Sequence, residues 1–231
     1  MKKEINEYST YSPLRLMPLN LRLINNYFSL IRFSHTVFAL PFAIIGFMLA
    51  VYFGGYPFRI SSIVLVILCM VFARSAAMAF NRYADRNIDK ANPRTAAREI
   101  PRGIVSPRSV LLFIIANVIL FIITTYFINR ICFALSPVAI GLILFYSYTK
   151  RFTRWCHLVL GLSLSLAPIG AFLAVAGQFQ ILPILFSMVV LFWVSGFDIL
   201  YALPDEQFDS EHHLYSVPGS FGRKTALYIS R

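Results

Sequence analysis

The sequence predicts an all-α membrane protein, a polytopic bundle of helices, and three observations support this prediction. Hydrophobic residues make up 58% of the 231-residue chain and charged residues only 13%, whereas soluble domains average about 45–50% apolar and about 25% charged residues. The mean hydropathy is +0.69. Most apolar residues fall in runs of about 20, the length a helix needs to cross a hydrocarbon core of about 30 Å. These observations exclude the soluble globular and the disordered classes.

Six apolar runs qualify as membrane spans, and we expect them to form one domain over residues 33–231. A mostly polar segment, residues 1–32, precedes them. Prolines within the runs are compatible with spans, because membrane helices tolerate such kinks where neighbours satisfy the freed carbonyls. The expected spans are residues 36–53, 60–80, 110–128, 131–148, 158–176 and 181–197.

The basic residues indicate the orientation of the chain. In a soluble protein the net charge of +11 would suggest a nucleic-acid partner, but these residues flank spans, so we expect a lipid bilayer and no nucleic acid. All Lys and Arg except Arg59, Arg74 and Arg130 lie before the first span or after the second, fourth and sixth. Cytoplasmic loops are enriched in such residues. The sequence therefore predicts a cytoplasmic N-terminus.

Acidic and amide residues recur at helical spacing in two segments, each following a span that ends on the cytoplasmic side. The first acidic cluster comprises Asn81, Asp85 and Asp89, and the second comprises Asp198, Asp205 and Asp209. Intervals of four place the first cluster on one face if its helix continues past Phe80. Intervals of seven and four form a similar stripe in the second, where we expect Pro204 to break or restart the helix.

Magnesium is the cofactor that these clusters favour. Carboxylates stacked near a bilayer repel one another and are poorly hydrated, so the arrangement is unfavourable without a bound cation. Oxygen ligands suit Mg²⁺, which binds through one or two carboxylates, waters and substrate phosphates. Two clusters on one side of the membrane predict a diphosphate held between them. The alternative for either cluster alone, solvated loop acids balancing nearby bases, stays open.

Basic residues near the clusters suit the same ligand. Arg94, Arg98 and Arg102 follow the first cluster at intervals of four, and Lys150 and Arg151 end the fourth span. Guanidinium and ammonium groups bind phosphate oxygens well. The alternative is that these residues set only the membrane topology.

Arg74 differs from the other bases because it lies inside a span. A cation there normally faces the bundle interior and has a partner, so a structural ion pair and a substrate contact are both open. The histidines at positions 35, 157, 212 and 213 show no His-x-x-x-His spacing, and we assign none of them as a metal ligand.

Three motifs resemble those of the UbiA superfamily of intramembrane prenyltransferases. The first acidic cluster is similar to the superfamily's Asn-x-x-x-Asp-x-x-x-Asp motif, and the second, with Tyr201 between its members, is similar to its second aspartate-rich motif. Residues 146–157, Tyr-Ser-Tyr-Thr-Lys-Arg-Phe-Thr-Arg-Trp-Cys-His, resemble the Tyr-x-x-x-Lys-Arg-x-Thr-x-x-x-Gln signature of 4-hydroxybenzoate polyprenyltransferases. The motifs occur in the family's order, and the resemblance covers residues 32–231.

The resemblance implies an integral enzyme of the bacterial inner membrane with a cytoplasmic active site. It implies transfer of a polyprenyl group from polyprenyl diphosphate to a ring carbon of a hydroxyaryl carboxylic acid, 4-hydroxybenzoate or a related naphthoate, in quinone biosynthesis. Each acidic cluster would hold a Mg²⁺ ion. Arg94, Lys150 and Arg151 would contact the diphosphate or the acceptor's carboxylate, and Tyr201 would assist the leaving group or orient Asp205.

The chain departs from the family pattern in three respects. Arg82 stands where many members have Asp, and His157 stands where Gln is common; with residues 92–103, these variants resemble a branch that acts in menaquinone synthesis through futalosine. The acceptor is therefore open between the two branches. The family's bundle has nine membrane helices and this chain has six predicted spans, so we expect a fragment or a naturally shortened form.

Two other functions remain as alternatives. An inactive or truncated remnant of the family would retain the motifs without turnover. A transporter for a divalent ion or phosphate would use the acidic clusters as a vestibule, and it predicts polar residues at mid-span on several helices. Only Arg74 and Asn117 meet that expectation.

Overall fold

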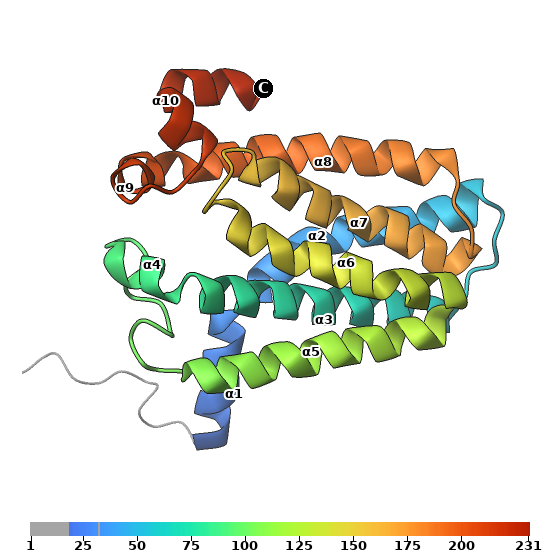
Figure 1. Cartoon of the computed structure of the whole chain (residues 1–231). Helices are drawn as coiled ribbons and strands as arrows, with labels where there is room; N and C mark the ends of the chain where they lie inside the picture. The colour runs from blue at the N-terminus through green and yellow to red at the C-terminus, as the bar shows by residue number, and fades with distance from the viewer. Residues whose placement is uncertain (1–18, 32) are drawn as a thin grey trace, which may run out of the picture.

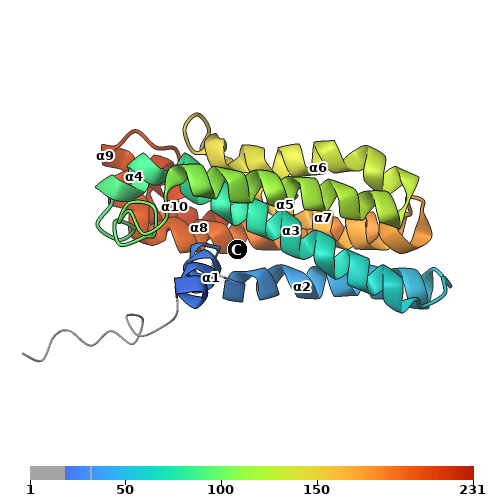
Figure 2. The same cartoon turned by 90° about the horizontal axis from the view of Figure 1, so that it is seen from below.

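The computed structural model of the chain describes residues 19–31 and 33–231, and the regular elements in these ranges are all helices. The predicted all-α class is confirmed. The long helices lie side by side in one bundle (Figures 1 and 2). The elements are α1 (Leu19–Leu30), α2 (Phe33–Met48), the π-helix η2 (Leu49–Phe53), α3 (Ile60–Ala84), α4 (Arg86–Ala91), α5 (Pro107–Ile128), α6 (Arg130–Thr149), α7 (Cys156–Ala176), α8 (Ile181–Ala202), the 3-10 helix η3 (Leu203–Asp205), α9 (Glu206–Glu211) and α10 (Val217–Ile229).

Five helices of the described chain are long and apolar enough to cross a membrane: α3, α5, α6, α7 and α8 with its continuation. The first predicted span is shorter as an α-helix, because the 16 residues of α2 give way to a π-helical turn of five residues, η2. Gly54 and Gly55 follow that turn, and Gly55 adopts a left-handed conformation that ends the helix. Residues 1–18 of the predicted N-terminal segment lie outside the described part.

Side-chain caps fix where α5 and α6 begin. Ser106 Oγ accepts a hydrogen bond from the Ser109 amide at 3.1 Å, with Pro107 at the first helical position of α5. Asn129 alone separates α5 from α6: its Oδ1 accepts from the Cys132 amide at 2.8 Å, and its Nδ2 donates to the Leu173 carbonyl at 2.8 Å. The same side chain therefore starts α6 and holds the far end of α7.

Two glycines allow α7 to lie close to its neighbours. A methyl group on Gly46 of α2 would overlap the backbone of Pro168, and one on Gly161 of α7 would overlap Ser195 and the carbonyl of Leu191 on α8. Small residues commonly permit such close packing between membrane helices. These contacts hold α2, α7 and α8 together along one side of the bundle.

Both acidic segments adopt the predicted helical path. The helix α3 ends at Ala84. The Asp85 amide then donates a hydrogen bond to the Asn81 carbonyl and the Asp89 amide donates one to the Asp85 carbonyl, so the helical spacing continues into α4. In the second segment the helix changes to 3-10 geometry around Pro204 and restarts as α9, as predicted. Figures 1 and 2 show α4 and α9 at the same end of the bundle. The topology thus brings the two clusters to one end.

Candidate active site

A polar cavity of about 230 Å³ lies at the end of the bundle that carries α4 and α9. Its walls come from segments far apart in sequence: the end of α3 with the loop after α4, the junction of α6 and α7, and the end of α8 with α9. Most predicted site residues line this cavity, whereas Arg102 and Arg151 do not. The lining includes Asn81, Asp85, Asp89, Arg94, Lys150, Asp198, Tyr201, Asp205 and Asp209. The two acidic clusters therefore share one hollow.

Asp85 is the most deeply buried acid of the site, with 2% of its surface exposed. Lys150 Nζ lies 2.5 Å from its Oδ2, and Arg151 Nη2 lies 2.9 Å from its Oδ1. Arg151 also donates to the carbonyls of Ser147 and Ala84, at 2.8 and 2.9 Å. The Lys-Arg pair after α6 thus supplies counterions to the first acidic cluster and ties α6 to the end of α3.

The two carboxylate oxygens of Asp89 differ, because one is paired with a base and the other receives no hydrogen bond from the described residues. Its Oδ1 pairs with Arg98 Nη1 at 2.6 Å, and its main-chain carbonyl accepts from the Thr95 hydroxyl at 3.1 Å. Its Oδ2 is buried, and no group of the described residues donates to it. Because buried carboxylate oxygens are normally hydrogen-bonded, this oxygen is an acceptor that a donor or a cation would satisfy.

Asp205 of the second cluster is held by the loop that follows the first. Arg94 donates from Nε to Asp205 Oδ1 at 2.8 Å and pairs through Nη2 with Oδ2, and Asn92 Nδ2 donates to Oδ1 at 3.1 Å. This charge-assisted fork raises the pKa of the Arg94 guanidinium. The loop after α4 is therefore a direct bridge between the two clusters.

These pairs revise one step of the sequence argument. Repulsion among the stacked carboxylates was taken to require a bound cation, yet the described chain provides its own cations to Asp85, Asp89 and Asp205. The repulsion alone therefore does not demand a metal. No three acidic, His or Cys side chains of the described residues lie together as a group that could hold a metal ion.

Asp198 pairs with a histidine to which the sequence assigned no role. His157, at the start of α7 and only 3% exposed, places Nδ1 2.7 Å from Asp198 Oδ2. The third acid of this cluster, Asp209, lies beside Ser216. The sequence signal for His157 was its place in the 146–157 signature, where Gln is common. Its pairing with Asp198, 41 residues further along the chain, was not predictable from that position.

Two other predicted residues are placed differently from the rest. The Tyr201 ring is about half exposed and stacks on Phe197 with centroids 6.3 Å apart. Among the described residues, the groups that orient Asp205 are those of the loop after α4 and not the Tyr201 hydroxyl. Arg102 is exposed and lies outside the cavity lining, so the interval of four that linked it to Arg94 and Arg98 does not bring it to the site.

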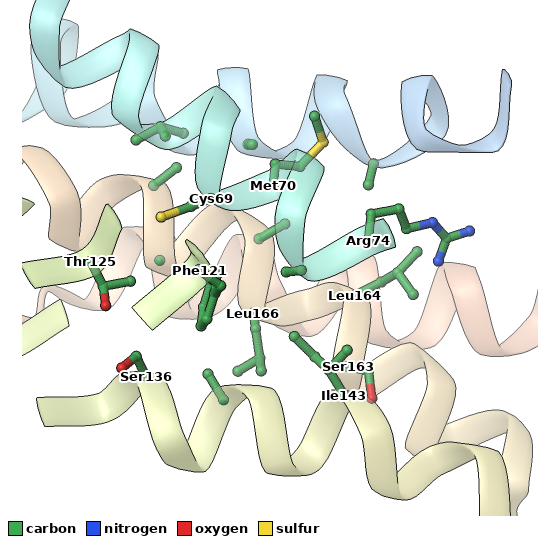
Figure 3. Close-up of a pocket in the computed structure, with 18 of the residues that line it drawn as sticks. Cys69, Met70, Arg74, Phe121, Thr125, Ser136, Ile143, Ser163, Leu164 and Leu166 are labelled. Carbon is green, nitrogen blue, oxygen red and sulfur yellow. The ribbon is translucent and has the colours of Figure 1, made fainter. Parts of the chain in front are cut away.

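An apolar cavity of about 180 Å³ adjoins the polar one inside the bundle. Tyr146 and Leu160 line both, so the two spaces meet at these side chains. Figure 3 shows the walls of the apolar cavity, which α2, α3, α5, α6 and α7 form with mostly small and aliphatic side chains. Labelled residues include Cys69, Met70, Arg74, Phe121, Thr125, Ser136, Ile143, Ser163, Leu164 and Leu166.

Arg74 is the charged residue of that apolar cavity (Figure 3). Its Nε is buried and bonds to no group of the described residues, and no acid there pairs with its guanidinium. Of the two readings left open by the sequence, the structural ion pair is thus not found among the described residues. Asn117, the other polar mid-span residue, donates to the Phe113 carbonyl of its own helix at 2.8 Å, which leaves little polar path for a transporter.

Comparison with known proteins identifies a matching family and several relatives of this chain. The sequence model of the UbiA prenyltransferase family matches residues 39–230. A 4-hydroxybenzoate octaprenyltransferase of Tolumonas auensis is 32% identical over 170 residues, which cover 73% of this chain and 59% of that protein. The enzyme of the same name from Francisella tularensis subsp. novicida is 31% identical over 175 residues, covering 76% of this chain and 61% of its own. The chain thus spans about six tenths of the length of these curated relatives.

Solved structures share the fold. An apo UbiA homolog from Aeropyrum pernix K1 superposes with a TM-score of 0.79 at 34% identity, over 85% of this chain and 73% of that one. A homolog from Archaeoglobus fulgidus, solved with DMAPP and Mg²⁺, superposes with a TM-score of 0.70 at 24% identity, over 89% of this chain and 73% of its own. The second likeness concerns the fold alone.

Proposed function

Because the chain belongs to the UbiA prenyltransferase family, we propose that it transfers a polyprenyl group from polyprenyl diphosphate to a ring carbon of a hydroxyaryl carboxylate. One observation above all supports this reaction: two acidic clusters separated by more than 100 residues line one polar cavity, together with the bases that a diphosphate requires. An adjoining apolar cavity offers space for the chain attached to that diphosphate. The diphosphate and the prenyl chain of the substrate would therefore occupy two cavities that adjoin each other.

The polar cavity suits a diphosphate bound with Mg²⁺. Its acidic groups supply only oxygen ligands, the kind that Mg²⁺ prefers, and Asp89 Oδ2 is a buried acceptor to which no described residue donates. We assign one ion to the first acidic cluster and one to the second, with Asp198 as the third member of the latter. Bound Mg²⁺ would neutralise the charge that grows on the departing diphosphate.

The bases of the cavity act on the same leaving group. Arg94 and Lys150, which line the cavity, and Arg151, which does not, are each held at a carboxylate of the lining. Guanidinium and ammonium groups placed there stabilise phosphate oxygens through charge-assisted hydrogen bonds. Tyr201, on the same wall, assists the leaving group in this proposal.

The apolar cavity positions the prenyl chain next to the site of bond cleavage. Its aliphatic lining keeps water away from the allylic carbon, so that the carbon is captured by the acceptor and not by water. In the reaction, the allylic carbon–oxygen bond breaks with its electrons on the diphosphate, a ring carbon of the acceptor forms the new carbon–carbon bond, and the ring loses a proton. In this proposal the ring of Tyr146, which lines both cavities, faces the developing cation.

Arg74 is the residue that we assign to the acceptor. Arg74 Nε is buried in an apolar wall and the guanidinium has no anionic partner among the described residues, which is costly in a membrane. A carboxylate offers the bidentate geometry that guanidinium binds best. A hydroxyaryl carboxylate, 4-hydroxybenzoate or a related naphthoate, presents such a group at one end and an electron-rich ring at the other.

The setting that we propose is the bacterial inner membrane, with the N-terminus and the polar cavity on the cytoplasmic side and the product used in quinone biosynthesis. The asymmetry of basic residues supports this orientation. The bacterial relatives named 4-hydroxybenzoate octaprenyltransferase support the pathway.

Direct assay of the chain tests the proposal. The purified protein in lipid nanodiscs is given labelled polyprenyl diphosphate with 4-hydroxybenzoate or a dihydroxynaphthoate, with Mg²⁺ or with EDTA. We expect a prenylated aromatic product only with Mg²⁺, and the acceptor that reacts identifies the branch. A folded chain that forms no product with either acceptor would contradict the proposal and favour the inactive remnant.

A further inference from the structure

His157 joins three elements that meet beside the polar cavity. It lies at the start of α7, its Nδ1 is 2.7 Å from Asp198 Oδ2 on α8, and its Nε2 accepts a hydrogen bond from the Val217 amide of α10 at 3.2 Å. The ring is 3% exposed and Val217 is fully buried. Each ring nitrogen therefore has a defined hydrogen-bond partner, and the Cys156 side chain also lies beside the ring, in a place with little access for water.

These two partners fix the tautomer of the ring. A backbone N–H group can only donate a hydrogen bond, so the Nε2 atom that accepts from the Val217 N–H carries no proton itself. The single ring proton is then on Nδ1, where it donates to the carboxylate of Asp198. A proton on both nitrogens would place two N–H groups against each other at Val217. The contact with Asp198 is thus a directed hydrogen bond whose orientation comes from the backbone of α10.

The Val217 amide is itself held firmly. Ser216 caps α10 through its Oγ, which accepts from the Gly219 amide at 3.1 Å. Just before it, the Tyr215 amide donates to the Lys150 carbonyl at 2.7 Å. The segment that orients His157 is therefore attached to the residue whose side chain pairs with Asp85 in the first cluster.

From this geometry we infer that His157 is a positioning residue for the metal site of the second acidic cluster. It engages Oδ2 of Asp198 and leaves Oδ1 without a hydrogen bond from the described residues, so one oxygen is anchored while the other is available to a cation. The inference rests on the proposed function insofar as it takes the bound cation to be Mg²⁺. Partners that orient a ligating carboxylate in this way commonly contribute tenfold or more to metal affinity.

Manganese binding gives a readout independent of turnover. Mn²⁺ accepts the same oxygen donors as Mg²⁺, and the loss of its free-ion EPR signal reports binding to the full chain in nanodiscs. The variants are H157L, which removes both hydrogen bonds, and H157Q, whose amide supplies one donor and one acceptor. The control is S165A, which removes a buried hydroxyl of the same helix that bonds only to its own backbone. If H157L does not fold, H157N, whose amide is too short to reach both partners, replaces it.

We expect H157L to weaken Mn²⁺ binding about tenfold to 100-fold, and H157Q and S165A to bind within about threefold of the wild type. In a D198N background H157L should cause little further loss, because the histidine acts through that carboxylate. Equal weakening by H157L, H157Q and S165A, or full additivity with D198N, would overturn the inference.

Prenyl transfer is assayed on the same samples to separate the two proposals. Mn²⁺ binding that depends on His157 without any prenyl transfer would overturn the reaction and leave the positioning role standing. Prenyl transfer together with Mn²⁺ binding that does not change in the His157 variants would overturn the positioning role and leave the reaction standing. A wild-type chain that binds no Mn²⁺ would contradict both.

Discussion

Replacing Asp85 with Asn tests the centre of the proposed site. The carboxylate is nearly inaccessible and receives two cations, Lys150 at 2.5 Å and Arg151 at 2.9 Å. Asn keeps the size of the side chain and removes its charge, so both bases lose their counterion while the packing around position 85 is retained. The substitution therefore isolates the electrostatic contribution of this carboxylate.

The expected magnitude follows from the burial of each partner. Removing one member of a buried ion pair costs about 3–5 kcal/mol, but Lys150 and Arg151 are 30% exposed and water compensates part of this. We expect a loss of about 1–3 kcal/mol in the free energy of unfolding, seen as a fall of about 5 °C in Tm. Turnover should fall at least about 100-fold, as on removal of a main electrostatic contact in an active site.

The assays are thermal unfolding in detergent, followed by tryptophan fluorescence, and prenyl transfer in nanodiscs. D85N combined with K150M provides the decisive control, because it removes one of the two unpaired cations. We expect the double variant to regain part of the lost Tm and none of the lost turnover. If D85N kept the wild-type Tm and turnover, Asp85 would be neither the partner of these bases nor part of the site.

Three further predictions concern the loop, the packing and the acceptor. R94Q should raise the KM for polyprenyl diphosphate about tenfold, measured by steady-state kinetics, while R102Q, at an exposed position outside the cavity, should leave it unchanged. G161A should lower the stability by about 2 kcal/mol in thermal unfolding, because its methyl group overlaps α8; G141A, which meets no atom within 4 Å, should be neutral. R74M should raise the KM for the aromatic acceptor about tenfold with the KM for the diphosphate within about twofold, and equal changes in both would refute the assignment.

Much of the framework was predictable from local sequence. Hydropathy located the six apolar segments, and a period of four placed Asp85 and Asp89 on a helical path that α3 and α4 follow. The break at Pro204 was also foreseeable, because proline cannot continue the hydrogen bonding of a helix. The π-helical end of the first span was not, since nothing in its apolar composition distinguishes it from an ordinary α-helix.

The sequence by itself determined the membrane class, the helical elements and the two acidic motifs, because length, hydropathy and period are properties of neighbouring residues. Only the tertiary structure decided which groups pair. Lys150 was foreseen as a phosphate ligand and is held at Asp85, Arg94 reaches across to Asp205, and His157 bonds to Asp198. These contacts join residues 41 to 111 positions apart, and such distances close only when helices pack. The folded bundle alone therefore shows which carboxylate oxygens are occupied and which remain open to a ligand.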